Sequence, residues 1–294
     1  MNMLYRRKFI GGLLQIFGGK LANIDLQKYL LLATDMQEKP LYEFTPYRYG
    51  CFSFTSYCDR RAMARDRLIK SLDERWEIDA KNDYLMMLNE EDRSILESIK
   101  NNFGKLTGDK LIKYVYDNYP YYTIKSEIAN QFLSDEEIKK NKEKYSHKTK
   151  AVFSIGYEGK SVEAFLNELI QNNVKILIDV RKNPISMKYG FSRSQIQGFL
   201  KNFGISYIHI PQLGIESEKR KGLKTADDYN DLFAEYEKTT LSNAGLYLWQ
   251  VKQLFDSYNR ICLMCFEADP NMCHRTRILK QLVSKSSITG YKDL

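Results

Sequence analysis

The chain has 294 residues, of which 43% are hydrophobic and 28% are charged. This length accommodates two domains of ordinary size, and the composition is typical of globular proteins. No stretch approaches the ~20 apolar residues that a membrane helix requires. We therefore expect a globular protein with no membrane partner.

The N-terminal segment resembles a signal peptide only in part. Arg6, Arg7 and Lys8 precede apolar residues, but Gln15 interrupts them and no small-residue cleavage site follows. The five cysteines are an odd number at uneven spacing, which argues against a disulfide framework of the secreted type. We expect a cytoplasmic protein.

The formal net charge is +8 and the isoelectric point is about 9.0. Such a balance permits an acidic partner such as nucleic acid. A lysine-rich surface without a partner gives the same totals, and the excess is divided evenly between the two halves of the chain. Charge alone does not decide between these alternatives.

A polar segment divides the chain. Residues 134–150 show no apolar periodicity after Ile138 and read as a helix tail that continues into a solvated linker. We expect a first domain over 1–135, a linker over 136–150 and a second domain over 151–294.

The first domain has a mostly helical pattern. Apolar residues at helical spacing precede Gly18 and Gly19, Asn23 can cap a second helix, and a basic helix is expected over 55–72. Two strand-like pieces follow, at 75–79 and 84–88. Three helices followed by a small hairpin is the order of a winged helix, a relative of the helix-turn-helix.

The basic helix is the candidate surface for DNA or RNA. Its candidate contacts are Arg60, Arg61, Arg65 and Arg67. The alternative is a solvated face, because Asp59, Asp66 and Asp73 lie among the arginines. A winged helix can also bind another protein, so both interpretations stay open.

The second domain alternates apolar strands with amphipathic helices. Strands are expected at 152–156, 175–180, 205–210 and 260–267, and a final helix is expected from 270 to about 284. Near-continuous apolar strands of this kind indicate an α/β fold with a Rossmann-like parallel sheet flanked by helices. Ligands of such sheets bind beyond the carboxyl ends of the strands.

Polar residues follow the first two strands. Gly156 and Gly159 flank Tyr157 and Glu158, and two glycines allow either a ligand to approach the backbone or a plain tight turn. Asp179 and Arg181 lie on one side of the second strand. They form either an ion pair that holds the loop or a carboxylate base with an arginine that binds phosphate.

The end of the fourth strand carries the densest set of polar residues. Cys265 and Glu267 share one side, Asp269 can cap a helix, and Pro270 suits its first position. We expect Cys273 in the first helical turn, where the helix dipole lowers a thiol pKa and attracts phosphate. His274 and Arg275 follow directly.

Two other interpretations of these cysteines stay open. Cys265, Cys273 and His274 could hold zinc, but adjacent helical residues diverge by ~100° and no CxxC pair is present. The cysteines could also pack simply as small apolar residues. We expect no metal or other cofactor.

The motifs SIGYEG, LIDVRKNPISMKYGFS, GISYIHIPQLG and LMCFEADPNMCHR resemble the domain of unknown function 488 family over residues ~151–285. The family usually has His where this chain has Tyr157, and often Arg where it has Met187. The resemblance implies no agreed reaction, but it implies a link to nucleic-acid metabolism or defence. The N-terminal half is similar to winged-helix-like extensions of such domains.

Two functions follow as hypotheses. The first is an enzyme acting on nucleotides or nucleic acid by glycosidic, phosphoester or base-modifying chemistry. The second is a non-catalytic DNA-binding regulator whose second domain binds a small anion or senses thiol oxidation. The candidate catalytic residues are Asp179, Glu267 and Cys273, and the candidate anion-binding residues are Gly156, Tyr157, Arg181, Cys265, His274 and Arg275.

Overall fold

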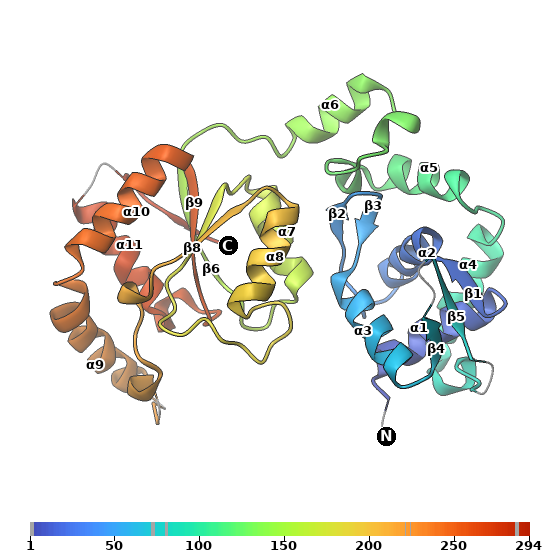
Figure 1. Cartoon of the computed structure of the whole chain (residues 1–294), viewed down its shortest axis with the longest axis horizontal. Coiled ribbons are helices and arrows are strands. Elements are labelled where there is room, and N and C mark those ends of the chain that lie inside the picture. The colour runs from blue at the N-terminus through green and yellow to red at the C-terminus, as the bar shows by residue number, and fades with distance from the viewer. Residues whose placement is uncertain (1–2, 72–73, 80–81, 221, 224, 286–287) are drawn as a thin grey trace. The chain divides into compact units, whose positions relative to one another are not determined.

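The computed structural model describes residues 3–71, 74–79, 82–220, 222–223, 225–285 and 288–294. The chain forms two compact units, Met1–Lys144 and Tyr145–Leu294 (Figure 1). No helix of the described residues is both long and apolar enough to cross a membrane.

The N-terminal unit combines helices with short antiparallel strands. Its elements are α1 (Tyr5–Ile16), β1 (Lys20–Ala22), α2 (Asn23–Asp35), β2 (Thr45–Tyr47), β3 (Gly50–Phe52), α3 (Phe54–Arg65), β4 (Ile69–Ser71), β5 (Arg75–Ile78), α4 (Glu90–Phe103), α5 (Asp109–Asn118) and α6 (Asp135–Glu143). One sheet has the order β1-β5-β4, and β2 pairs with β3. The helix predicted before Gly18 is α1, and both Gly18 and Gly19 have positive φ.

The predicted hairpin is wrong in its position. The structure pairs β4 with β5, whereas residues 84–88 contain the 3₁₀ helix Leu85–Met87. The basic helix ends at Arg65 rather than 72, because Arg67 takes a left-handed conformation with φ 56° and β4 begins two residues later. Asn23 is the first residue of α2, and Ala22 occupies the cap position.

A buried ionic cluster ties α3 to the start of the chain. Asp59 is fully buried and accepts hydrogen bonds from Arg6 Nε at 2.5 Å, Arg7 Nε at 2.7 Å and the Tyr42 hydroxyl at 3.0 Å. Asp59 therefore does not belong to a solvated face. It neutralises two partly exposed arginines of α1.

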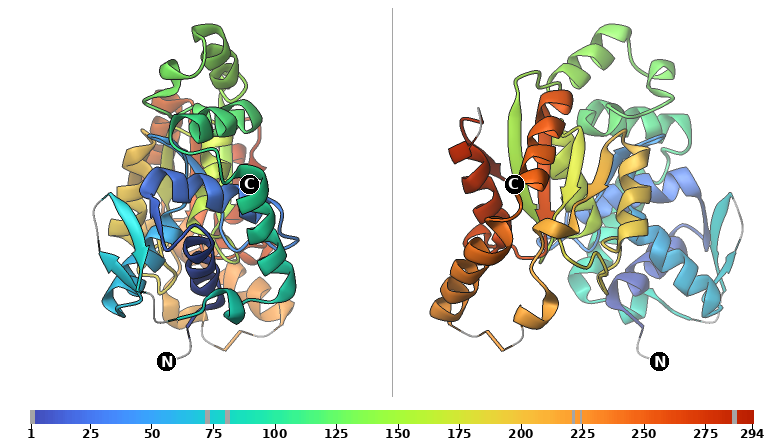
Figure 2. Two further views of the ribbon diagram at one scale, coloured as in Figure 1. Left: turned by 90° about the vertical axis from the view of Figure 1, so that its right-hand side faces the viewer. Right: turned by 60° about the vertical axis from the view of Figure 1, so that its left-hand side comes forward.

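The C-terminal unit is an α/β domain with a five-stranded parallel sheet, which confirms the predicted fold class. Its elements are β6 (Ala151–Gly156), α7 (Val162–Gln171), β7 (Ile176–Asp179), α8 (Arg193–Asn202), β8 (Ser206–His209), α9 (Ala226–Tyr236), α10 (Gly245–Tyr258), β9 (Arg260–Cys265), α11 (His274–Lys285) and β10 (Lys292–Asp293). The strand order is β10-β6-β9-β7-β8. Helices α7 and α8 cover one face, and α9, α10 and α11 cover the other (Figure 2).

This topology makes the carboxyl ends of β6, β9 and β7 the expected position of a ligand crevice. The chain leaves β6 towards α7 on one face and leaves the neighbouring β9 towards α11 on the opposite face. Between two such strands the connecting segments separate, and open α/β sheets bind their ligands at this point.

We expect Asp59→Ala to lower the free energy of unfolding by about 1.5–3 kcal/mol, because it removes the buried carboxylate that accepts hydrogen bonds from two partly exposed arginines and a tyrosine hydroxyl. Asp66→Ala is the control, since its partner Arg65 is largely exposed and such pairs contribute at most about 1 kcal/mol. Chemical denaturation of the full chain measures both. Equal effects of the two changes would contradict the cluster's role.

Candidate functional site

The first strand to reach the site, β6, ends beneath a crossing backbone. A Cβ at Gly156 would lie 1.8 Å from the Glu267 carbonyl oxygen, so no other residue fits there. The Phe266 carbonyl also accepts hydrogen bonds from the backbone N–H groups of Tyr157 and Glu158. Gly156 therefore serves close approach of the protein's own chain, not of a ligand.

Asp179 and Arg181 form a closed pair at the end of β7. Arg181 donates to both carboxylate oxygens of Asp179, with Nε–Oδ1 at 2.9 Å and Nη2–Oδ2 at 2.6 Å. The Tyr207 hydroxyl donates to the same carboxylate at 2.8 Å. The pKa of Arg181 is raised, since the Asp179 carboxylate outweighs burial, which acts to lower it.

The remaining donor of Arg181 faces the α7 side of the sheet. Its Nη1 donates to the Tyr157 hydroxyl and to the Phe191 carbonyl, each at 3.0 Å, and the Tyr157 ring stacks on the Phe191 ring at 4.4 Å. Nε, Nη1 and Nη2 of Arg181 thus all have protein partners. This geometry favours the ion-pair interpretation, in which Asp179 and Arg181 hold the loop.

Cys273 does not lie in a helix, which corrects the sequence prediction. Residues Pro270–Met272 form a 3₁₀ turn, Cys273 is extended with φ −133° and ψ 138°, and α11 begins only at His274. The expected divergence of two successive helical side chains therefore does not apply. Cys273 and His274 both approach Cys265 at the end of β9.

These three residues form what we call the thiol–imidazole cluster: Cys265, Cys273 and His274. All are buried, and their possible ligand atoms lie within 4.8 Å of one another. His274 Nδ1 is 3.6 Å from Cys265 Sγ and 4.0 Å from Cys273 Sγ. The cluster lies on the α11 side of the sheet, since Cys265 and Cys273 pack with residues of α10 and α11.

The thiol with the lowered pKa is Cys265 rather than Cys273. Burial acts to raise the pKa of Cys265, but the Cys273 thiol, His274 and Arg220 hold it well below its usual range. Burial raises the pKa of Cys273 well above its usual range, and the neighbouring Cys265 adds to this effect. The prediction that the helix dipole lowers the pKa of Cys273 is wrong, because burial and Cys265 dominate.

Two more side chains complete this edge of the site. Arg220 pairs with the Glu267 carboxylate and lies 2.7 Å from His274 Nδ1 through its Nη2. Cys265 Sγ lies 3.1 Å from the other carboxylate oxygen of Glu267. The sequence analysis missed Arg220, which lies in a polar 3₁₀ segment, Ser217–Arg220, where no strand or helix pattern marks it.

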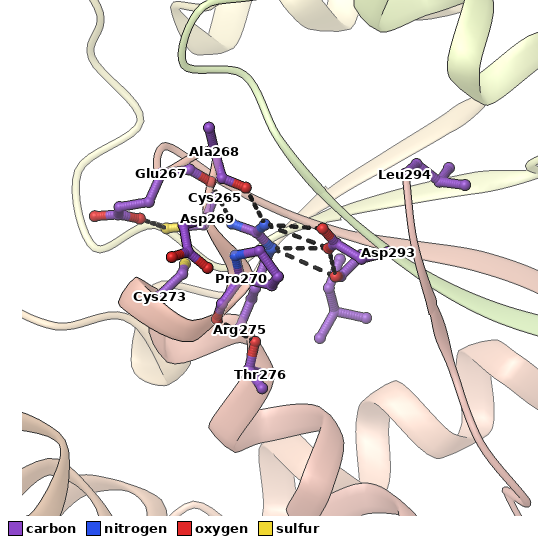
Figure 3. Close-up of polar contacts among 12 residues, drawn as sticks. Cys265, Glu267, Ala268, Asp269, Pro270, Cys273, Arg275, Thr276, Asp293 and Leu294 are labelled. Carbon is purple, nitrogen blue, oxygen red and sulfur yellow. Dashed lines mark hydrogen bonds and ion pairs between the residues drawn. The ribbon is translucent and has the colours of Figure 1, made fainter. Parts of the chain in front are cut away.

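Arg275 is a structural residue in this arrangement. It is fully buried and donates to the carbonyl oxygens of Glu267 at 2.5 Å and Ala268 at 3.1 Å, and it contacts the Asp293 carboxylate of β10 at 3.3 Å (Figure 3). Its donors face the protein interior, so it fixes the loop that carries Glu267.

A cavity of about 310 Å³ connects the two sides of this edge. It is lined by Arg181 and Tyr157 on one side and by Cys265, His274 and Arg220 on the other. Asp179, Glu267 and Cys273 lie outside its lining. The structure therefore brings four of the predicted residues, Tyr157, Arg181, Cys265 and His274, to one cavity and leaves the Asp179 carboxylate enclosed beneath it.

A family model described as Domain of unknown function DUF488 matches residues 161–282. The match lies within the C-terminal unit and overlaps the motifs in which the sequence resembles this family. Neither a curated protein nor a solved structure matches the chain.

We expect Gly156→Ala to destabilise the protein and to displace the loop that carries Glu267, because the added methyl group overlaps the Glu267 carbonyl. Gly198→Ala in α8 is the matched control. Nothing lies within 4 Å of its added methyl group, and alanine in a helix stabilises by about 0.5–1 kcal/mol. Thermal unfolding measures the loss of stability, and the reactivity of Cys265 with a thiol reagent reports the displacement of the loop. A Gly156→Ala variant with unchanged stability and unchanged Cys265 reactivity would contradict this close approach of the backbone.

Proposed function

We propose that the C-terminal unit, which contains the match to the DUF488 model, is an enzyme that processes nucleotides or nucleic acid in the cytoplasm. The expected reaction is cleavage of a glycosidic or phosphoester bond or modification of a base. All five cysteines are free thiols, which supports the cytoplasmic part of the proposal.

The observation that carries the proposal is the mixed character of the cavity. Two cationic side chains, Lys182 and Arg220, belong to its lining. Its lining also includes apolar side chains that are unusually open to solvent: Ile185 is 81% exposed, Met187 is fully exposed and Phe266 is 43% exposed. A nucleotide offers the matching pair of features, an anionic phosphate and a flat apolar base.

Glu267 is the group best suited to proton transfer. Its side chain is mostly buried, and the Arg220 guanidinium holds one carboxylate oxygen while the other faces Cys265 Sγ. This pairing fixes the carboxylate next to Arg220 and Cys265, two residues that line the cavity, which suits a group that transfers protons. Asp179 is less accessible, because its side chain is fully buried beneath Arg181 and Tyr207, whereas the Glu267 side chain is 14% exposed.

We expect Glu267→Gln to lower turnover by about 10²–10⁴-fold while the affinity for the ligand changes little, since the amide keeps the size but cannot accept the proton. A panel of nucleotides and short oligonucleotides identifies the substrate, and calorimetry measures its affinity. Glu168→Gln in α7 is the control, because its partner Lys160 lies outside the cavity. Unchanged turnover in Glu267→Gln would exclude Glu267 as the base.

For the N-terminal unit we propose a winged-helix module that contacts DNA or RNA. The order α1, β1, α2, α3, β4, β5 and the sheet order β1-β5-β4 support it, since winged helices follow their third helix with a hairpin. Arg61, Arg65 and Arg67 are exposed on or just after α3. Arg60 instead packs over the Trp76 ring at 5.2 Å and donates to the Arg75 carbonyl.

The same topology favours the second candidate function, a DNA-binding regulator whose C-terminal unit binds a small anion without turning it over. The Glu267→Gln experiment separates the two candidates. A regulator has a ligand but no turnover to lose.

We expect the full chain to bind nucleic acid with an affinity that falls steeply with salt concentration. The triple change Arg61→Ala, Arg65→Ala and Arg67→Ala should make the plot of log affinity against log salt less steep, by the amount that about three phosphate contacts contribute. Fluorescence titration of single- and double-stranded DNA and RNA at several salt concentrations measures both. The charge-matched control replaces Lys139, Lys140 and Lys142, which are exposed on or beside α6. An equal loss in the control would show that only net charge matters.

A further inference from the structure

We infer that the thiol–imidazole cluster, Cys265, Cys273 and His274, binds one zinc ion or a similarly soft divalent cation. The inference does not depend on the proposed reaction, because the cluster is defined by its own geometry. Two cysteines and one histidine are a ligand set that zinc uses when a fourth position is left for water or substrate.

The spacing of the cluster fits a single ion. Zinc–sulfur bonds of about 2.3 Å and zinc–nitrogen bonds of about 2.0 Å, at tetrahedral angles, place a sulfur and a nitrogen ligand roughly 3.5 Å apart. The observed separations from His274 Nδ1 are 3.6 Å to Cys265 Sγ and 4.0 Å to Cys273 Sγ. Small side-chain rotations therefore complete the coordination.

His274 is already held in the required tautomer. Its Nε2 lies 3.1 Å from the Val180 carbonyl oxygen, which can only accept a hydrogen bond, so Nε2 carries the proton. Nδ1 then presents its lone pair to the two sulfurs. Metal-binding histidines are usually fixed in this way by a backbone carbonyl or a carboxylate on the other ring nitrogen.

The surroundings compensate the charge of two thiolates. Arg275 lies next to Cys273, and Arg220 lies next to Cys265 and His274. Arg220 Nη2 occupies the Nδ1 lone pair at 2.7 Å, so metal binding requires this guanidinium to withdraw. Its side chain is 24% exposed at the cavity, so it can turn towards solvent.

Either of two groups can occupy the fourth coordination position of the ion. Cys265 and His274 line the cavity, so water or substrate can reach an ion that they hold. Glu267 lies 3.1 Å from Cys265 Sγ through one carboxylate oxygen and is close enough to become a ligand instead. An open fourth position is the pattern of catalytic zinc, and a closed one is the pattern of structural zinc.

The test is the metal content of the full chain, purified under reducing conditions and dialysed against Zn²⁺ or Co²⁺. We expect one ion per chain, and with Co²⁺ the sulfur-to-metal charge-transfer absorption and the strong visible bands of a tetrahedral site. Cys265→Ser and Cys273→Ser should each weaken binding by about 100-fold or more, beyond the 10- to 100-fold typical of a lost outer partner.

Cys58→Ser is the matched control, since it removes a thiol from α3 in the other unit and should leave binding unchanged. Circular dichroism checks that each variant is folded. Should a cysteine variant fail to fold, a rise in the melting temperature of the wild-type chain with Zn²⁺ but not with Mg²⁺ tests the site without it.

Absence of stoichiometric metal in the fully reduced chain would overturn the inference, as would binding that survives loss of either cysteine. A disulfide between Cys265 and Cys273 that reforms after reduction, detected by mass after alkylation, would also overturn it. Loss of turnover in Glu267→Gln with full metal content supports the inference and the proposed function separately, because the two readouts are independent.

Discussion

One buried guanidinium, that of Arg275, fixes the loop that carries the candidate site of the C-terminal unit. Arg275 projects from the first turn of α11, donates to the carbonyl oxygens of Glu267 and Ala268, and meets Asp293 of β10 (Figure 3). A buried arginine requires several acceptors, and the loop after β9 supplies them with its backbone. This contact draws the loop across Gly156 and sets the positions from which Glu267, Cys273 and His274 reach the site.

The site is shared between the two faces of one sheet. Asp179, Arg181 and Tyr157 form a closed network on the α7 side, and the thiol–imidazole cluster lies on the α11 side. The two sets meet because β9 lies between β6 and β7 and the connections from these strands leave on opposite faces. The first set shapes the cavity, and the second carries the groups that remain available for chemistry.

The sequence predicted the elements whose apolar patterns are long and uninterrupted. The four strands β6, β7, β8 and β9 and the helices between them follow such patterns. The strand β10 has two residues, Lys292 and Asp293, and no pattern of that length can be recognised. The hairpin was misplaced because the hydrophobic run at 84–88 satisfies a strand pattern, while the tertiary fold uses it as a 3₁₀ turn.

The candidate site was predictable in its residues but not in its local geometry. Asp269 and Pro270 do begin a helical turn, yet that turn ends at Met272, so Cys273 becomes extended and faces Cys265. Only the path of the backbone shows that adjacent Cys273 and His274 can converge. Arg220 reaches the same point from a polar loop, a long-range contact that no local pattern contains.

The strand order also determines when the protein can complete its fold during synthesis. β9 pairs with both β6 and β7, yet it is made about 80 residues after β7. Until β9 leaves the ribosome, β6 and β7 lack the neighbour that they share and expose unpaired backbone edges. The N-terminal unit precedes the C-terminal sheet in the chain. Its contacts can therefore form while that sheet still lacks its central strand, β9.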